Sequence, residues 1–472
     1  MGELIKNFFI YGLGGILTKL VGFFLLPIFT SQLTPEEYGY YDLILSISAI
    51  IGAIAIMQYD AGFQRYYYKQ ESEIEKDILV STIFYIIVML SSIAAILFVI
   101  AVPFVSSLWF SHGYLTALRL AGVEVVVANV LIYLLCVLRY ENRPKQYAVI
   151  AVCSALLNAF LCISFVVYFH LGVTGALLGS IFSQLTICLI ILLIERKRLV
   201  LVFDILILKK VSMFAFPMVP ARIGSVANSY ANRFFMISMF TAEMIGLYSL
   251  SLKLSSAIGL IQTAFQFAWL PYLYKILNRD GHKEIIIEVF RQCVYAICLI
   301  VLLISIFAQD IVMLVSNRGY LEAYTILGFL CLYNGIYIIK DTAEIGVKVT
   351  GKSIYVTYAY FISVAINFLF LFILPRYCGL IGIALSLLLS NIVLIYLTLY
   401  FSNRLYKINF PVRLFSIVLV LTILLIFGTI TVDIPIFIKI LISLAIIAIW
   451  GLYNKTTLLK LHTSMIHKVR HA

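Results

Sequence analysis

Apolar runs of around 20 residues recur from one end of the chain to the other, and this recurrence constrains the fold more than any other feature. An α-helix of that length crosses the roughly 30 Å of hydrocarbon in a bilayer. A β-barrel would show alternating segments of about 10 residues, which the sequence lacks. Hydrophobic residues make up 63% of the 472 residues and charged residues only 12%, more apolar surface than a soluble chain can bury. We therefore predict an all-α integral membrane protein.

Charged loops and loops marked by Pro or Gly divide the apolar runs into about 14 predicted transmembrane helices. Lys and Arg gather in alternate loops, such as the one with Arg139, Arg143 and Lys145, whereas Arg318 and Arg376 mark the other side. By the positive-inside rule, both termini are expected in the cytoplasm. The formal charge of +12 is thus explained by topology, and no nucleic-acid partner is predicted. The loops are too short for a folded catalytic domain.

The chain also repeats itself at an offset of about 200 residues. FTSQLTPEEYGYYDLILSISAI (29–50) aligns with FMISMFTAEMIGLYSLSLKLSSAI (235–258), so that Gly39 falls on Gly246. A second match, between segments that begin at 143 and 351, pairs Asn158 with Asn367 and Gly172 with Gly379. Two matches at nearly the same offset indicate an internal duplication.

Six helices per repeat is an even number, so both copies enter the membrane from the same side, as in transporters built from parallel repeats around a central cavity. We predict an N-lobe of helices 1–6 over 1–205 and a C-lobe of helices 7–12 over 206–410. Two extra helices, 13 and 14, occupy 411–472 together with a basic cytoplasmic tail, TTLLKLHTSMIHKVRHA.

Three segments carry a resemblance to a known family. LTPEEYGYYDL resembles the L-x-P-x-E-Y-G-x-Y motif of Wzx-type polysaccharide flippases, which belong to the multidrug/oligosaccharidyl-lipid/polysaccharide (MOP) exporter superfamily. MQYDAGFQRYYYKQ resembles the end of their second helix. FPMVPARIGSVANSYANRFFMISMFTAEMIGLYSLSLKLS resembles their helices 7 and 8, with Arg233 and Lys253 kept. Asn232 stands where the family more often has Asp, which leaves Arg233 without its usual local counter-charge.

The resemblance implies a two-lobed, MATE-like transporter that uses alternating access. It would flip undecaprenyl-pyrophosphate-linked oligosaccharide repeat units, as in O-antigen synthesis, from the inner to the outer leaflet of the bacterial cytoplasmic membrane. The implied partners are that lipid-linked oligosaccharide, the bilayer, and a polysaccharide polymerase with its chain-length regulator; a monomer is expected. Proton or sodium coupling and use of the membrane potential alone both stay open.

Buried basic residues are the first candidates for substrate binding, because an ionised side chain inside a bilayer usually faces a polar cavity or a partner. Arg222 and Arg233 are eleven residues apart, which places them within about 20° on one helix face and about 16 Å apart. Arginines suit a pyrophosphate because a guanidinium can bind it in bidentate fashion. Lys19, Lys253 and Arg119 are further candidates. For Arg222 and Arg233, the alternative is a structural cation that extends to the cytoplasmic or the outer membrane surface, respectively.

Two acids, Asp60 and Glu124, are the candidates for binding a coupling ion. Asp60 could instead lie at the inner interface near Arg65, and Glu124 could be paired across helices. Lys340 and Glu344, one helical turn apart, are expected to form a local ion pair. The six histidines have no ligand spacing with Cys or acids, so neither a metal site nor a cofactor is predicted.

Two alternatives come from the same superfamily, a lipid II flippase and a cation-coupled multidrug exporter. A third alternative is a membrane enzyme, such as a polysaccharide polymerase or ligase. An enzyme of that class needs a sizeable outer loop with charged catalytic groups, which this chain lacks, so we predict that the protein is not an enzyme.

Overall fold

The computed structural model describes residues 2–453 except 111–113, 142, 278–279, 351, 353 and 433. The described residues form helices joined by loops and contain no strand, which confirms the all-α class. The basic tail from Thr456 to Ala472 lies outside the described residues. The chain forms two compact units, which are described separately: Met1–Ser249 with Val315–Tyr320, and Leu250–Leu314 with Leu321–Ala472. The predicted lobe boundaries refer to the sequence repeat and stay a prediction.

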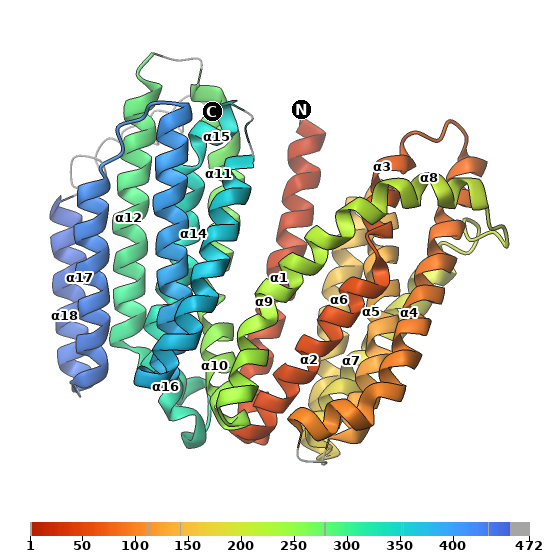
Figure 1. Cartoon of the computed structure of the whole chain (residues 1–472), viewed down its shortest axis with the longest axis horizontal. Helices are drawn as coiled ribbons and strands as arrows, with labels where there is room; N and C mark the ends of the chain where they lie inside the picture. The colour runs from red at the N-terminus through yellow and green to blue at the C-terminus, as the bar shows by residue number, and fades with distance from the viewer. Residues whose placement is uncertain are drawn as a thin grey trace. The chain divides into compact units, whose positions relative to one another are not determined.

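Unit 1 is built from the helices that run from red to yellow-green in Figure 1. They are α1 (Gly2–Gln32), α2 (Pro35–Ile56), α3 (Tyr59–Tyr67), α4 (Glu73–Trp109), α5 (Leu115–Tyr140), α6 (Pro144–Ile163), a π-helical turn (Ser164–Tyr168), α7 (Gly172–Ile194), α8 (Ile205–Ala215), a 3-10 turn (Phe216–Met218) and α9 (Val219–Met239). Helix α5 packs against α2, α4 and α7, while α6 packs against α1 and α7.

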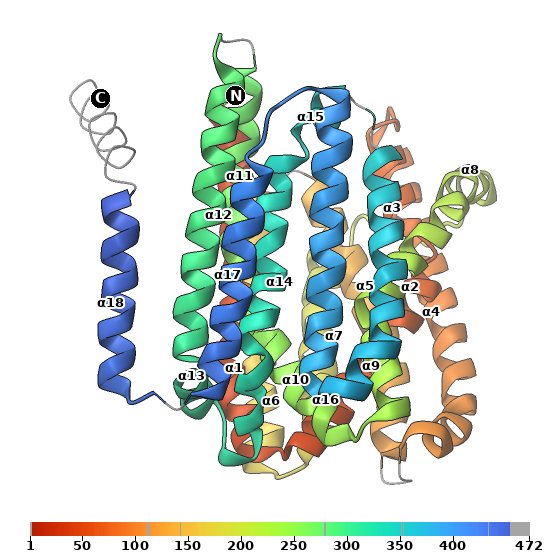
Figure 2. The ribbon, with the colours of Figure 1, turned by 60° about the vertical axis from the view of Figure 1, so that its left-hand side comes forward.

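Helix α10 (Ala242–Ser255) begins in unit 1 and ends in unit 2. The remaining helices are α11 (Ile258–Ile276), α12 (His282–Ile306), α13 (Ala308–Val315), a 3-10 segment (Arg318–Ala323), α14 (Tyr324–Ala343), α15 (Ile345–Thr350), α16 (Ile354–Leu405), α17 (Val412–Thr431) and α18 (Ile436–Tyr453). In unit 2, α14 lies between α12 and α16, and α17 packs on α12 (Figure 2).

Among the described residues, 10 helices are long and apolar enough to cross a membrane, and Leu17–Gln32 and Ile436–Ala448 form shorter apolar helices. One of the ten, α16, has 52 residues, more than twice the length that one crossing needs. Its backbone leaves the helical region at Gly379, which divides α16 into two helical segments. Helix α9 is too polar to belong to this set. The count of 14 therefore stays a prediction.

The α6–α7 hairpin and the two segments of α16 are held by hydrogen bonds at matching positions of the repeat. In unit 1, the Ser183 hydroxyl donates to the backbone oxygen of Ser154 at 3.2 Å. In unit 2, the Ser363 hydroxyl donates to the backbone oxygen of Ser390 at 2.7 Å. Ser154 matches Ser363 and Ser183 matches Ser390 at offsets of about 200 residues. The same contact with donor and acceptor exchanged supports the internal duplication.

Glycines that the repeat aligns have matching roles. Gly172 and Gly379 have φ of 54° and 53°, a left-handed conformation that glycine adopts without strain. Gly39 on α2 and Gly246 on α10 face each other, and a Cβ on Gly39 would lie 1.9 Å from the carbonyl oxygen of Ala242. Only a residue without a side chain permits this crossing.

The LTPEEYG segment explains how α2 begins. Thr34 is the N-cap: its hydroxyl accepts the Glu37 amide at 3.2 Å, and the Glu37 carboxylate accepts the Thr34 amide at 2.9 Å. Such a capping box satisfies helix donors that would otherwise lack partners. Pro35 at the first position suits a helix start, because its fixed φ is already helical. The motif thus sets both the start of α2 and, through Gly39, its crossing with α10.

Candidate functional site

Helix α9 begins after a break in the preceding helix. Pro217 lies in the 3-10 turn that separates α8 from α9, and Pro220 lies in the first turn of α9. The two prolines account for this break, since proline cannot donate to the helical hydrogen-bond ladder. The break lets α9 take its own direction and carry Arg222 and Arg233.

Arg233 is a buried residue held by an acid from a distant part of unit 1. Its guanidinium donates through Nε to the Asp42 carboxylate of α2, and the Ser249 hydroxyl of α10 donates to the same carboxylate at 2.7 Å. Arg233 is 8% exposed. The neighbouring position holds Asn232 and supplies no local counter-charge, but Asp42 on α2 supplies the acid from a distant part of the chain.

Two further contacts fix the Arg233 side chain. Its Nη1 donates to the backbone oxygen of Ser229 at 3.1 Å. The guanidinium carbon lies 5.1 Å from the Tyr230 ring centroid and 5.9 Å from that of Tyr248, distances typical of cation–π contacts. Arg233 thus links α2, α9 and α10 and has few directions left for an added ligand.

Arg222 is held far more loosely. Its Nη1 lies 3.7 Å from Oδ2 of Asp60 on α3, and the Arg222 side chain is 34% exposed. The other carboxylate oxygen of Asp60, Oδ1, is buried and has no hydrogen-bond partner among the described residues. Asp60 therefore pairs with Arg222 rather than with Arg65, whose guanidinium lies 4.1 Å from the Phe214 ring centroid. The Arg222–Asp60 pair keeps unused donors and an unused acceptor.

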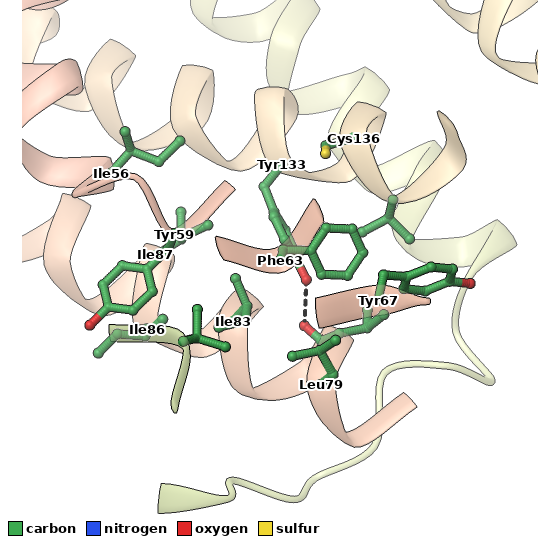
Figure 3. Close-up of a cluster of buried hydrophobic side chains, with 13 residues drawn as sticks. Ile56, Tyr59, Phe63, Tyr67, Leu79, Ile83, Ile86, Ile87, Tyr133 and Cys136 are labelled. Carbon is green, nitrogen blue, oxygen red and sulfur yellow. Dashed lines mark hydrogen bonds between the residues drawn. The ribbon is translucent and has the colours of Figure 1, made fainter. Parts of the chain in front are cut away.

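A buried apolar cluster fixes the helix that carries Asp60. Met57 and Gln58 have φ of 45° and 60°, which ends α2 and redirects the chain into α3. Tyr59, Phe63 and other side chains of α3 then pack against α4, α5 and α8 (Figure 3). The Tyr133 hydroxyl, central to this cluster, donates to the Val80 backbone oxygen at 2.8 Å. Because α3 is anchored, Asp60 has a defined place beside α9.

Glu124 on α5 lies beside a pocket of about 350 Å³ between α1, α5, α6 and α7. The Gln184 side-chain nitrogen donates to the Glu124 carboxylate at 3.5 Å and to the Ser180 hydroxyl at 2.8 Å. Gln184 lines the pocket together with Thr18 and Asn158. Glu124 is thus bonded across helices by an uncharged amide, and its role in ion coupling stays a prediction.

The other basic candidates, Lys19, Arg119 and Lys253, are exposed in their own units. None of the three lies within 4.0 Å of a carboxylate oxygen among the described residues. Lys19 lies on α1 and Arg119 on α5 of unit 1, while Lys253 lies in the unit 2 part of α10. Their substrate-binding roles stay predictions.

A second set of charges joins the connecting segments at one end of unit 1. This loop cluster consists of Glu73, Lys76, Asp77, Glu141, Arg143, Glu195 and Arg198. Arg198 contacts Glu141 at 2.6 Å and Asp77 at 3.2 Å, and Arg143 contacts Glu195 at 2.6 Å. Three cations therefore face four carboxylates. Burial, and then the neighbouring Glu195 carboxylate, raise the pKa of Glu141 to about 7.

Unit 2 has a compact polar group on α14. Lys340 and Glu344 are 2.9 Å apart, which confirms the predicted local ion pair. Asp341 accepts hydrogen bonds from the side chains of Gln262 at 3.2 Å and Gln266 at 2.6 Å, both on α11. Lys348 lies 4.0 Å from Glu344, so two cations face two carboxylates and the charges of the group balance. Among the described residues, no three His, Cys, Asp or Glu side chains are grouped as a metal site requires.

Comparison with known proteins places the chain in a family. The family model for polysaccharide biosynthesis proteins matches residues 30–323, more than half of the sequence. The chain belongs to the polysaccharide biosynthesis protein family. The match includes the start of α2 and all of α9, so it covers both of the paired arginines. A search of the curated proteins found no significant match.

Three solved structures share the fold. The lipid II flippase MurJ in an inward closed conformation is similar with a TM-score of 0.73 and 15% identity, over 95% of this chain and 100% of that chain. An inward-facing MATE family multidrug resistance transporter of the MOP superfamily has a TM-score of 0.62 and 16% identity, over 82% of this chain and 94% of that chain. A variant of the Vibrio cholerae MATE transporter VcmN has a TM-score of 0.53 and 15% identity, over 85% of this chain and 97% of that chain. This family member therefore has the MOP transporter fold.

Sequence reasoning missed Asp42. It is a membrane-segment acid one residue beyond the Tyr41 that the repeat aligns with Tyr248, so its position beside the aligned motif was an available signal. Its partner, however, is 191 residues away, a pairing that only the packing of α2 against α9 reveals. Asp341 was also missed, although its neighbour Lys340 was noted.

Proposed function

We propose that this protein flips a polyprenyl-pyrophosphate-linked oligosaccharide from the inner to the outer leaflet of the bacterial cytoplasmic membrane by alternating access. The observation that carries the proposal is the asymmetry of the two arginines on α9: Arg233 is buried in a close ion pair, whereas Arg222 is one-third exposed and loosely paired. Membership of the polysaccharide biosynthesis family and the MOP transporter fold support a lipid-linked sugar as substrate.

The chemistry follows from that asymmetry. A pyrophosphate offers strong acceptors to a guanidinium, and Arg222 can turn from Asp60 to the phosphate at small cost because their separation is already 3.7 Å. The freed Asp60 carboxylate can then take a proton or a cation, which would couple ion binding to substrate binding. Arg233 acts as the fixed point that holds α9 against α2. An inside-negative membrane potential would also favour outward movement of the anionic headgroup.

The proposal includes a topology with both termini in the cytoplasm and no catalytic step. The exposed cations Lys19, Arg119 and Lys253 would add positive potential along the substrate path. A proton or a sodium ion as coupling ion, and a monomeric transporter, are part of the same proposal. The polysaccharide polymerase and chain-length regulator would act on the flipped product.

The experiment is loss of the gene in its native host, followed by complementation. We expect loss to cause lipid-linked oligosaccharide to accumulate on the inner leaflet and outer-leaflet polysaccharide to disappear. Arg222→Ala should fail to complement, while Arg222→Lys should retain part of the activity. Normal outer-leaflet polysaccharide in the deletion strain would refute the flippase function. Full activity of Arg222→Ala would leave that function standing and remove the pyrophosphate-binding role of Arg222.

A second candidate function is a lipid II flippase, favoured by the similarity to MurJ over 95% of this chain. Its substrate would also carry a pyrophosphate, so Arg222 would have the same role. The discriminating test is replacement of the host's lipid II flippase by this protein. Survival of the host would support lipid II as substrate, whereas lysis with intact export of the native polysaccharide would support the first proposal.

A further inference from the structure

A pocket of about 610 Å³ lies in unit 2 where α16 ends and α17 begins. Its walls are the last turns of α16 and the connection to α17, and they include Tyr400, Asn403, Arg404 and Lys407. Figure 2 shows this connection at the same end of unit 2 as α15. Because α16 and α17 are both apolar membrane-crossing helices, their ends mark the level of a membrane surface. The pocket therefore opens at a lipid–water interface.

The pocket is basic and has no acid in its lining. Arg404 and Lys407 are exposed, and neither lies within 4.0 Å of a carboxylate oxygen among the residues that the structure describes. A third cation, Lys283 at the start of α12, lies 4.9 Å from the ring centroid of Tyr406, the residue before Lys407. An anion in this pocket would meet two unpaired positive charges.

The backbone around these charges is held in place. The Asn403 side-chain oxygen accepts the Ile408 amide at 2.9 Å, which closes the turn that contains Arg404 and Lys407. Ile408 is 1% exposed, and the Phe410 ring packs on that of Phe290 with centroids 5.0 Å apart. The two cations therefore project from a fixed turn rather than from a free loop, which reduces the entropy that a ligand must overcome.

The remaining lining is aromatic and apolar. Tyr400 is 60% exposed at the end of a membrane-crossing helix, where tyrosines commonly lie at the level of lipid headgroups. Leu399 and Val412 provide apolar walls on either side of the turn. A ligand that fits carries a phosphate at one end and hydrocarbon at the other.

We propose that this pocket binds the headgroup of an anionic glycerophospholipid, with the phosphate between Arg404 and Lys407 and the acyl chains along α16 and α17. A lipid suits the site better than a free phosphate ion, because the volume exceeds that of the ion and the apolar walls would be left facing water. Basic pockets between membrane helices commonly take such lipids. The inference does not depend on which molecule the protein transports.

The test measures lipid binding to the full-length protein by native mass spectrometry and by titration with fluorescent phosphatidylglycerol in detergent. We expect saturable binding that the Arg404→Gln/Lys407→Gln double variant weakens about thirty-fold, since each basic residue near a membrane surface contributes about fivefold. Phosphatidylcholine should bind no better than background. Equal affinity of wild type and the double variant for phosphatidylglycerol would overturn the proposal.

The matched control is Arg196→Gln/Lys197→Gln, which removes the same charge from an exposed loop of unit 1. It should bind phosphatidylglycerol as wild type does; an equal loss would mean that only net charge matters, which also overturns the site. Arg404→Lys/Lys407→Arg should retain binding and shows that a loss is not misfolding. Inorganic phosphate is the competitor that tests for a free ion. If it displaced fluorescent phosphatidylglycerol at the same concentration as unlabelled phosphatidylglycerol does, the ligand would be a free phosphate ion, and the proposal would be contradicted.

Discussion

Two sets of ion pairs in unit 1, those of α9 and those of the loop cluster, use the same residue types in opposite ways. On α9, each arginine has one acid, which comes from a different helix: Asp42 for Arg233 and Asp60 for Arg222. In the loop cluster, three cations share four carboxylates. A matched pair can open and exchange its acid for an incoming anion. A cluster with excess carboxylate repels an anion, so it serves to hold chain segments together.

The comparison also separates the two arginines of α9 from each other. Arg233 resembles the loop cluster in having several partners, namely Asp42, the Ser229 backbone oxygen and two tyrosine rings. Arg222 has a single distant partner. The ion pairs therefore range from fixed to exchangeable. The loss of stability on substitution should be largest for the fixed pairs and smallest for the exchangeable one.

The largest effect on stability is expected for Arg233→Ala. Removing the guanidinium leaves the Asp42 carboxylate without its cation in a site where it is 21% exposed, which should lower the free energy of unfolding by about 3–5 kcal/mol. The measurement is the thermal unfolding of the purified protein in detergent. Adding Asp42→Asn should recover part of the loss, because the uncompensated charge is then absent.

Lys145→Ala is the control for Arg233→Ala. Lys145 is an exposed cation in the first turn of α6, and its removal should change the free energy of unfolding by less than about 0.5 kcal/mol. If Arg233→Ala lowered the free energy of unfolding no more than Lys145→Ala does, Arg233 would belong with the exchangeable residues. The assignment of Arg233 as the fixed arginine of α9 would then be wrong.

The next largest effect is expected for Arg198→Ala in the loop cluster. Arg198 contacts carboxylates at the start of α4, at the end of α5 and at the end of α7. Its loss leaves Arg143 as the cation nearest to the buried Glu141 and Glu195, and should cost about 2–3 kcal/mol. Thermal unfolding measures this as well, and unchanged export of polysaccharide in the surviving protein would agree with a structural role.

The difference between local and distant pairs explains how much of the site could be predicted. Lys340 and Glu344 are four residues apart on one helix, so helical spacing alone gives their contact. Arg222 and Arg233 share a face for the same reason. Asp42 and Asp60 reach α9 only through tertiary packing, and for Asp60 through two left-handed residues, Met57 and Gln58, that redirect the chain. No spacing rule contains that information.

The fold could be predicted more fully than the site, because a chain that crosses a bilayer must satisfy its backbone hydrogen bonds within the membrane and few structures do so. Helix class and the internal duplication followed from run lengths and aligned motifs. The long helix α16, with its change of direction at Gly379, could be anticipated from the alignment of that glycine with Gly172. The compact units do not end at the repeat boundary, since α10 contributes to both. Hydropathy alone does not report where the compact units divide.

A smaller effect is expected from pH at Glu141. Its pKa is raised to about 7 by burial and by Glu195, so the folded protein favours the protonated form. The associated stability is present at acidic pH and is lost as the pH rises from about 4.5, the unfolded value, through about 7. Melting temperatures between pH 5 and 8 should fall more for wild type than for Glu141→Gln. Parallel curves would show that Glu141 is ionised throughout and that the cluster does not hold a proton.

The smallest effect on stability is expected for Arg222→Ala, which makes it the sharpest test of the comparison. The pair with Asp60 spans 3.7 Å and is partly exposed, so its loss should cost less than about 1 kcal/mol, and thermal unfolding should be nearly that of wild type. The substitution should nevertheless abolish polysaccharide export, because the exchangeable guanidinium is the one that we propose binds the anionic substrate. A large drop in melting temperature would show instead that Arg222 is a second fixed point, and that α9 has no exchangeable cation.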